Sequence, residues 1–188
     1  MPNNITSFDI GESQVKVVTL SGGSVKKAVA LELPDNVVSG GTVLSMDALA
    51  DFLKEKLRAS GPIKKDAAVI LPDSLVFARN ITVPPMTDAQ LNYNLPFEFK
   101  DYLNQEKSRY YFDYAVQGME KDESGETTGL RLFACATLKK TIEDYRAMFY
   151  RAGYKLKLAL PEEAAFGNLA ALHAKNAPGD EDLCIVDI

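Results

Sequence analysis

A predicted tight turn near the start of the chain carries residue types that bind phosphate. Asp9 lies near the end of an apolar run over residues 4–10, and Gly11 and Ser13 precede a second run over residues 15–20. Glycine allows close approach of the backbone, and N–H groups in such a turn can donate to phosphate oxygens. An aspartate beside them can hold Mg²⁺ through its water shell. The turn is therefore a candidate phosphate site, with an ordinary hairpin turn as the alternative.

The composition excludes several other kinds of site. The 188 residues are 46% hydrophobic and 25% charged, which is typical of a globular protein with one large or two small domains. A net charge of −5 disfavours non-specific nucleic-acid binding, because that binding needs clustered cations. Cys135, Cys184 and His173 are too few for a disulfide framework or a zinc cluster, so we expect no metal held directly by the protein. No signal peptide or run of about 18 apolar residues occurs, so we expect a cytoplasmic chain without direct membrane insertion.

The turns and apolar runs predict an α/β unit in the first part of the chain. Glycine-containing turns separate three short strands, and a helix with one apolar face and a further apolar strand follow them. The order β-β-β-α-β predicts a mixed sheet beneath a helix. These elements are expected over residues 4–10, 15–20, 25–33, 46–59 and 67–71.

A second pattern begins after Pro72 and predicts a separate α+β unit. Thr87 and Gln90 have the spacing of a capping box, so a helix should begin there and break or kink near Pro96. Strands over 75–83, 110–117, 130–137 and 154–160, with a second helix over about 142–152, complete the order β-α-β-β-α-β. Pro161 then opens a last helix before a final apolar strand. We therefore predict a core over residues 1–74 and 161–188, with an inserted subdomain over residues 75–160.

The two ends of the chain resemble each other. Residues 5–10 and residues 183–188 both read as an apolar run followed by Asp-Ile, and only the first is followed by glycine. We expect the chain to be the N-terminal part of a longer protein whose second half begins with another such hairpin. The incomplete edge should recruit a second copy, so we also expect a homodimer through residues 161–188.

The motifs together resemble a known family. The segment FDIGESQVK at residues 8–16 is similar to the first phosphate loop of the actin-like ATPase superfamily, and CIVDI at residues 184–188 is similar to the start of its second loop. KKDAAVILPDSLVFARNITVPPM, LPFEF and KLALPEEAAFGNLAAL resemble the PilM proteins of type IV pilus assembly, which are related to FtsA of cell division. The resemblance implies the first lobe of an actin-like, ribonuclease H-like ATPase fold with an inserted subdomain.

The same resemblance implies where a nucleotide would bind in the full-length parent. ATP and Mg²⁺ would be its cofactors, while this part of the chain alone is expected to bind none and to catalyse no reaction. Glu12 departs from the family pattern, because a small residue is usual there. An anion about 4 Å from a phosphate costs on the order of 4 kcal/mol at an effective dielectric of 20. The resemblance places the cofactor-binding positions at Asp9, Gly11, Ser13, Lys16 and Asp187.

The resemblance also implies a function and a partner. A PilM-like scaffold binds the cytoplasmic N-terminal tail of a single-span, PilN-like membrane protein, in a groove between the core and the inserted subdomain. It is then peripheral to the inner face of the cell membrane through that partner. An FtsA-like division protein and an ATPase or kinase of the same superfamily are the alternatives. The expected partner-binding residues lie at the junctions between the two parts and are Leu71, Pro72, Pro84, Pro85, Met86 and Leu160.

Overall fold

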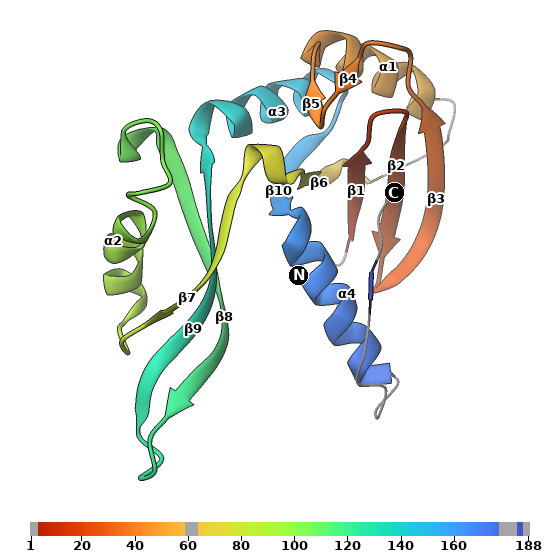
Figure 1. Cartoon of the computed structure of the whole chain (residues 1–188). Helices are drawn as coiled ribbons and strands as arrows, with labels where there is room; N and C mark the ends of the chain where they lie inside the picture. The colour runs from red at the N-terminus through yellow and green to blue at the C-terminus, as the bar shows by residue number, and fades with distance from the viewer. Residues whose placement is uncertain (1–3, 59–63, 177–183, 186–188) are drawn as a thin grey trace. The chain divides into compact units, whose positions relative to one another are not determined.

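The computed structural model describes residues 4–58, 64–176 and 184–185, and the chain forms two compact units (Figure 1). The first unit comprises residues 1–72 and 148–188, and the second unit comprises residues 73–147. The second unit is therefore an insertion within the first in the order of the chain.

A five-stranded mixed sheet forms the centre of the first unit. Its spatial order is β10-β6-β1-β2-β3. Strand β1 is antiparallel to β2 and parallel to β6, and β6 is parallel to β10. The early strands make a meander because glycine-containing turns of two to three residues separate them. The strands are β1 (Asn4–Ile10), β2 (Gln14–Ser21), β3 (Ser24–Glu32), β6 (Asp66–Leu71) and β10 (Lys155–Pro161).

Aromatic side chains fill the core between this sheet and the helices of the first unit. Phe8 of β1 is fully buried, and its ring centroid lies 4.8 Å from that of Phe149 and 5.1 Å from that of Tyr154, both in edge-to-face geometry. The apolar face predicted for α1 is buried through Leu49, Ala50, Leu53 and Leu57. The remaining elements of this unit are α1 (Met46–Arg58), α4 (Glu162–Asn176), the last residues of α3 (Lys139–Arg151), β4 (Val38–Ser39) and β5 (Thr42–Val43).

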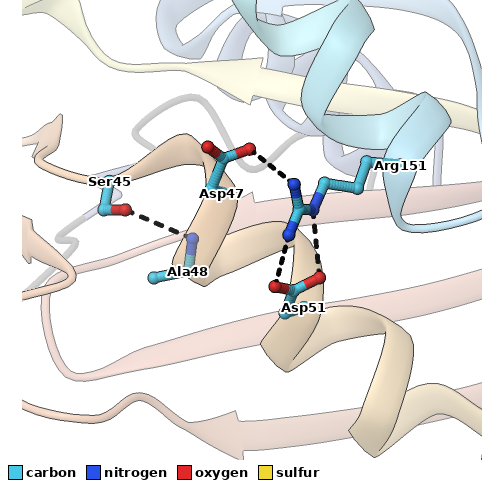
Figure 2. Close-up of polar contacts among 5 residues, drawn as sticks. All are labelled: Ser45, Asp47, Ala48, Asp51 and Arg151. Atoms are coloured by element: carbon cyan, nitrogen blue, oxygen red, sulfur yellow. Dashed lines mark hydrogen bonds and ion pairs between the residues drawn. The ribbon is translucent and has the colours of Figure 1, made fainter.

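An ion pair joins α1 to the end of α3 within the first unit (Figure 2). The Arg151 guanidinium donates to both carboxylate oxygens of Asp51, at 3.0 and 2.6 Å, and to Asp47 at 3.1 Å. The hydrogen bond and charge of Arg151 lower the pKa of Asp51, and the Asp51 carboxylate raises the pKa of Arg151 in turn. The Ser45 hydroxyl accepts a 3.2 Å hydrogen bond from the Ala48 N–H and caps the start of α1.

The second unit is a three-stranded antiparallel sheet with α2 packed on one face (Figure 1). Alternate residues of the central strand β9, at Leu130, Leu132, Ala134 and Ala136, are buried toward that helix. The strand order is β7-β9-β8, so β7 and β8 are both edge strands. The elements are β7 (Phe77–Val83), α2 (Asp88–Glu98), β8 (Tyr110–Lys121), β9 (Thr127–Leu138), the short 3₁₀ helices η1 (Asp73–Leu75) and η2 (Lys107–Arg109), and the start of α3.

Helix α2 begins where the sequence predicts. The Thr87 hydroxyl accepts from the Gln90 N–H, and the Gln90 side chain accepts from the Thr87 N–H, so the capping box is complete. A break or kink was expected near Pro96, but the helix includes Pro96 and ends two residues later at Glu98.

Two features of the fold differ from the sequence analysis. The inserted unit ends at residue 147 instead of residue 160, because the strand that follows α3, β10, pairs with β6 in the sheet of the first unit. The inserted unit therefore lacks the final strand of the predicted β-α-β-β-α-β order. The small β4–β5 hairpin was not predicted, because strands of two residues carry no alternation of polar and apolar side chains.

Candidate functional site

The turn between β1 and β2 brings four of the predicted cofactor residues together. The antiparallel register places Asp9 opposite Lys16, and the Lys16 ammonium lies 3.2 Å from the Asp9 carboxylate. The Gly11 N–H donates to the Gln14 carbonyl at 3.0 Å and closes the turn. A Cβ atom at Gly11 would lie 3.2 Å from that same oxygen, so the tight turn favours glycine there. Ser13 is exposed at its tip.

Glu12, the departure from the family pattern, has a defined partner. Its carboxylate accepts a short hydrogen bond from the Gly40 N–H in the turn between β4 and β5. Gly40 and Gly41 have φ values of 55° and 70°, as a two-residue hairpin turn with two left-handed residues requires. The Glu12 carboxylate is therefore bound to the β4–β5 hairpin, a contact that was not predicted from the sequence.

The donor set of the β1–β2 turn fits a phosphate group. Lys16 supplies a cation, and Asp9 supplies an anion suited to the water shell of Mg²⁺. The fifth predicted residue, Asp187, lies outside the described residues.

The predicted partner-binding residues fall into two groups, one in each unit. In the first unit, Leu71, Pro72 and Leu160 lie at or just after the carboxyl ends of the parallel neighbours β6 and β10, where Leu160 is in register with Ile70. Leu71 is only 2% exposed and belongs to the core, whereas Pro72 and Leu160 are half-buried. A partner could therefore contact the last two directly and the first only after a rearrangement.

The second group follows β7 in the second unit. Pro84 and Pro85 are exposed and Met86 is half-buried. Pro84 and Met86 help to line a cavity of about 240 Å³ between α2 and the sheet. The other residues that line the cavity were not predicted from the sequence, because they depend on which face of α2 packs on the sheet. These residues are Val83, Leu91, Asn94, Leu95, Phe97, Glu98 and Leu132.

Solved structures with related folds cover most of this chain. A chain of a PilM–PilN type IV pilus biogenesis complex aligns with a TM-score of 0.76 and 22% identity, over 91% of this chain and 50% of that one. The cytoplasmic domain of EpsL, an inner membrane component of the Vibrio cholerae type II secretion system, aligns with a TM-score of 0.54 and 14% identity, over 84% and 57%. This chain accordingly shares the fold of these proteins over most of its own length, and it spans about half of theirs.

More distant comparisons add less. A Bacteroides thetaiotaomicron protein described as having an actin-like ATPase fold and unknown function aligns with a TM-score of 0.45 and 9% identity, over 92% and 57%. The comparison with curated proteins gave no match. Among the described residues, no helix is long and apolar enough to cross a membrane.

The family assignment follows from the sequence as a whole. A family model described as "Type IV pilus assembly protein PilM" matches residues 7–188. The match includes the β1–β2 turn, the entire second unit and α4, so both units contribute to it. This chain belongs to the PilM family of type IV pilus assembly proteins.

Proposed function

We propose that the protein is a PilM-type assembly scaffold that binds the cytoplasmic N-terminal tail of a single-span, PilN-like membrane protein. The observation that carries this proposal is the family match over residues 7–188. A chain of a PilM–PilN complex also shares its fold with 91% of this chain. Membership of this family favours a pilus scaffold over an FtsA-like division protein or a kinase. The proposed location is the cytoplasm, peripheral to the membrane through the partner.

The first unit offers chemistry suited to an extended tail. Among the described residues, no strand pairs with the outer side of β10, so its N–H and C=O groups on that side would be available to a further strand. Pro72 and Leu160 add apolar surface near its carboxyl end. Main-chain hydrogen bonds at a sheet edge provide affinity, and pockets for alternate side chains provide specificity.

Nucleotide binding by the longer protein is a separate part of the proposal. Lys16 and the N–H groups of the β1–β2 turn would bind phosphate oxygens, and Asp9 would orient water molecules on a bound cation. Bound ATP would bring a γ-phosphate to this turn, and bound ADP would not. Glu12 bound to Gly40 would keep its negative charge on the β4–β5 hairpin.

Isothermal titration calorimetry tests the scaffold proposal. The titrant is a synthetic N-terminal tail of the PilN-type protein from the same organism. We expect micromolar or tighter binding by the unaltered chain, and binding at least tenfold weaker for Leu160→Lys, which places a charge beside the edge of β10. Val25→Lys is the matched control, because Val25 is 61% exposed on the opposite edge strand β3. An absence of binding heat at high micromolar concentration would refute the proposal.

A further inference from the structure

We propose that the cavity of the second unit is a docking site for a peptide segment of a partner protein, in which an apolar side chain enters the cavity and an adjacent Lys or Arg pairs with Glu98. The cavity is formed entirely within the second unit, between α2 and the strands β7 and β9. This site is additional to the proposed binding of the membrane partner's tail at the edge of β10.

The volume of the cavity indicates what kind of group could occupy it. Its volume of about 240 Å³ is below the roughly 300–1,000 Å³ that is usual for cofactor and drug-sized ligands. It therefore suits one side chain of a longer segment better than a nucleotide or another whole small molecule. The rest of the segment would lie on the surface around it, as in the recognition of peptides by grooves.

The floor of the cavity is apolar and belongs to the core of the unit. Val83, Leu91, Leu95 and Leu132 line it and are each less than 7% exposed. An inserted side chain would leave water for these surfaces, which is favourable by roughly 25 cal/mol per Å² of apolar surface buried. A leucine, methionine or phenylalanine has the shape and polarity for this position.

The aromatic rim is held in place before any partner binds. The Lys107 ammonium lies 3.6 Å from the centroid of the Phe97 ring. The centroids of the Tyr93 and Phe97 rings are 6.0 Å apart. The Asn94 amide donates to the Met86 sulfur at 3.5 Å and links the helix to the segment after β7. A preformed rim lowers the entropy cost of binding, because fewer side chains must be ordered.

The Glu98 carboxylate at the rim of the cavity favours a ligand with a positive charge. Glu98 lines the cavity and is exposed, and among the described residues no ion pair involves its carboxylate. Its backbone carbonyl accepts from Arg79 at 2.8 Å, which fixes this end of α2. Two cations lie beside the rim: Arg79, which donates to that backbone carbonyl and lies 4.0 Å from the centre of the Tyr102 ring, and Lys107, whose ammonium is directed to the Phe97 ring. The net charge of −5 on the whole chain also favours a basic partner segment.

Two capped dipeptides serve as probes for this site. N-acetyl-Leu-Arg-amide and N-acetyl-Leu-Glu-amide are titrated into the ¹⁵N-labelled 188-residue chain, and amide shifts are followed by NMR. We expect saturable shifts clustered at residues 83–98, with a dissociation constant in the millimolar range for the Arg probe. The Glu probe should bind at least threefold more weakly. Glu98→Gln should reduce this difference to within twofold.

A cavity-filling variant separates binding from general surface contact. Asn94→Phe should place a ring in the cavity and abolish saturation by either probe. Tyr150→Ala, which removes an aromatic ring that is 82% exposed in the first unit, is the matched control and should leave both titrations unchanged. Circular dichroism confirms that each variant is folded.

Three results would overturn this inference: non-saturable shifts, equal affinities of the two probes, or saturation that persists in folded Asn94→Phe. The tail titration and its Leu160→Lys variant examine another surface, so either proposal can fail without the other. If the membrane partner's tail bound but lost no affinity in Asn94→Phe, the cavity would not be part of the tail site.

Discussion

Arg151 is a single residue whose contacts imply a dependence on pH. Its hydrogen bond lowers the pKa of Asp51 below the ordinary value of 3.8, so the pair stabilises the fold when Asp51 is ionised. The contribution is present above that value and is lost as pH falls through the lower pKa of the folded state. Arg151→Met should lower the thermal midpoint at pH 7 by a small amount, since both groups are exposed to solvent.

Thermal unfolding of both proteins from pH 7 to pH 3 measures this effect. The difference between the midpoints should shrink as Asp51 becomes protonated at the acid end. A difference that stayed constant down to pH 3 would assign the stabilisation to packing of the Arg151 stem instead of to its charge.

The contact between Glu12 and Gly40 can be tested with single substitutions at Glu12. Its carboxylate accepts from the Gly40 N–H, so its removal should expose that amide to exchange. We predict that Glu12→Ala speeds hydrogen–deuterium exchange in residues 38–43 at least several-fold, whereas Glu12→Gln, which retains a carbonyl acceptor, restores much of the protection. Equal exchange in all three proteins would show that the β4–β5 hairpin is held by other contacts.

At the scale of elements, the capping box determines where α2 begins. Thr87→Ala removes the hydroxyl that accepts from the Gln90 N–H, and such losses cost about 0.5–2 kcal/mol. Urea denaturation followed by circular dichroism should show a lower free energy of unfolding by that amount. Asn92→Ala is the control, because Asn92 is exposed within the same helix and alanine favours helix. An unchanged free energy for Thr87→Ala would contradict the capping role.

The packing of α3 on the first sheet depends on Phe8. Its ring is fully buried against Phe149 and Tyr154 in edge-to-face geometry. Phe8→Ala should destabilise the chain by about 3–5 kcal/mol, since it leaves a cavity in a close-packed core. Calorimetric unfolding checks this figure. A loss below about 1 kcal/mol would mean that the site collapses around the smaller side chain.

The sequence predicts those elements whose signals are local. Thr87 and Gln90, three residues apart, predict the start of α2, and the periodicity of apolar residues predicts the buried face of α1. The β4–β5 hairpin and its contact with Glu12 were missed because that contact spans 28 residues and its strands are two residues long. The boundary at residue 147 was missed because the pairing of β10 with β6 joins segments distant in sequence.

The candidate sites were likewise predictable only where their residues are close together in the sequence. The pairing of Asp9 with Lys16 is a consequence of a short hairpin, so both positions could be predicted from the turn. The cavity of the second unit depends on which face of α2 meets the sheet. Pro84 and Met86 were predicted as partner-binding residues of a groove between the core and the inserted subdomain, whereas the structure places them with Phe97 and Glu98 at a cavity within the second unit.

At the scale of the whole molecule, α4 gives a prediction about association. Leu169 and Leu172 are 52% and 55% exposed on that helix, and apolar side chains of this size favour contact with another surface. We predict that the 188-residue chain dimerises through residues 161–188. In light scattering across a wide concentration range, Leu169→Lys with Leu172→Lys should be monomeric. A strictly monomeric unaltered chain would contradict the prediction.

We propose that this PilM-family chain binds the tail of a membrane partner. Hydrogen–deuterium exchange of the chain with saturating PilN-type tail peptide tests it most directly, because exchange reports both binding and its location. We expect slower exchange in the backbone of β10 near Leu160 and in the segment that includes Pro72, with little change at strand β3 on the other side of the sheet. Unchanged exchange throughout, or protection confined to β3, would refute tail binding at β10.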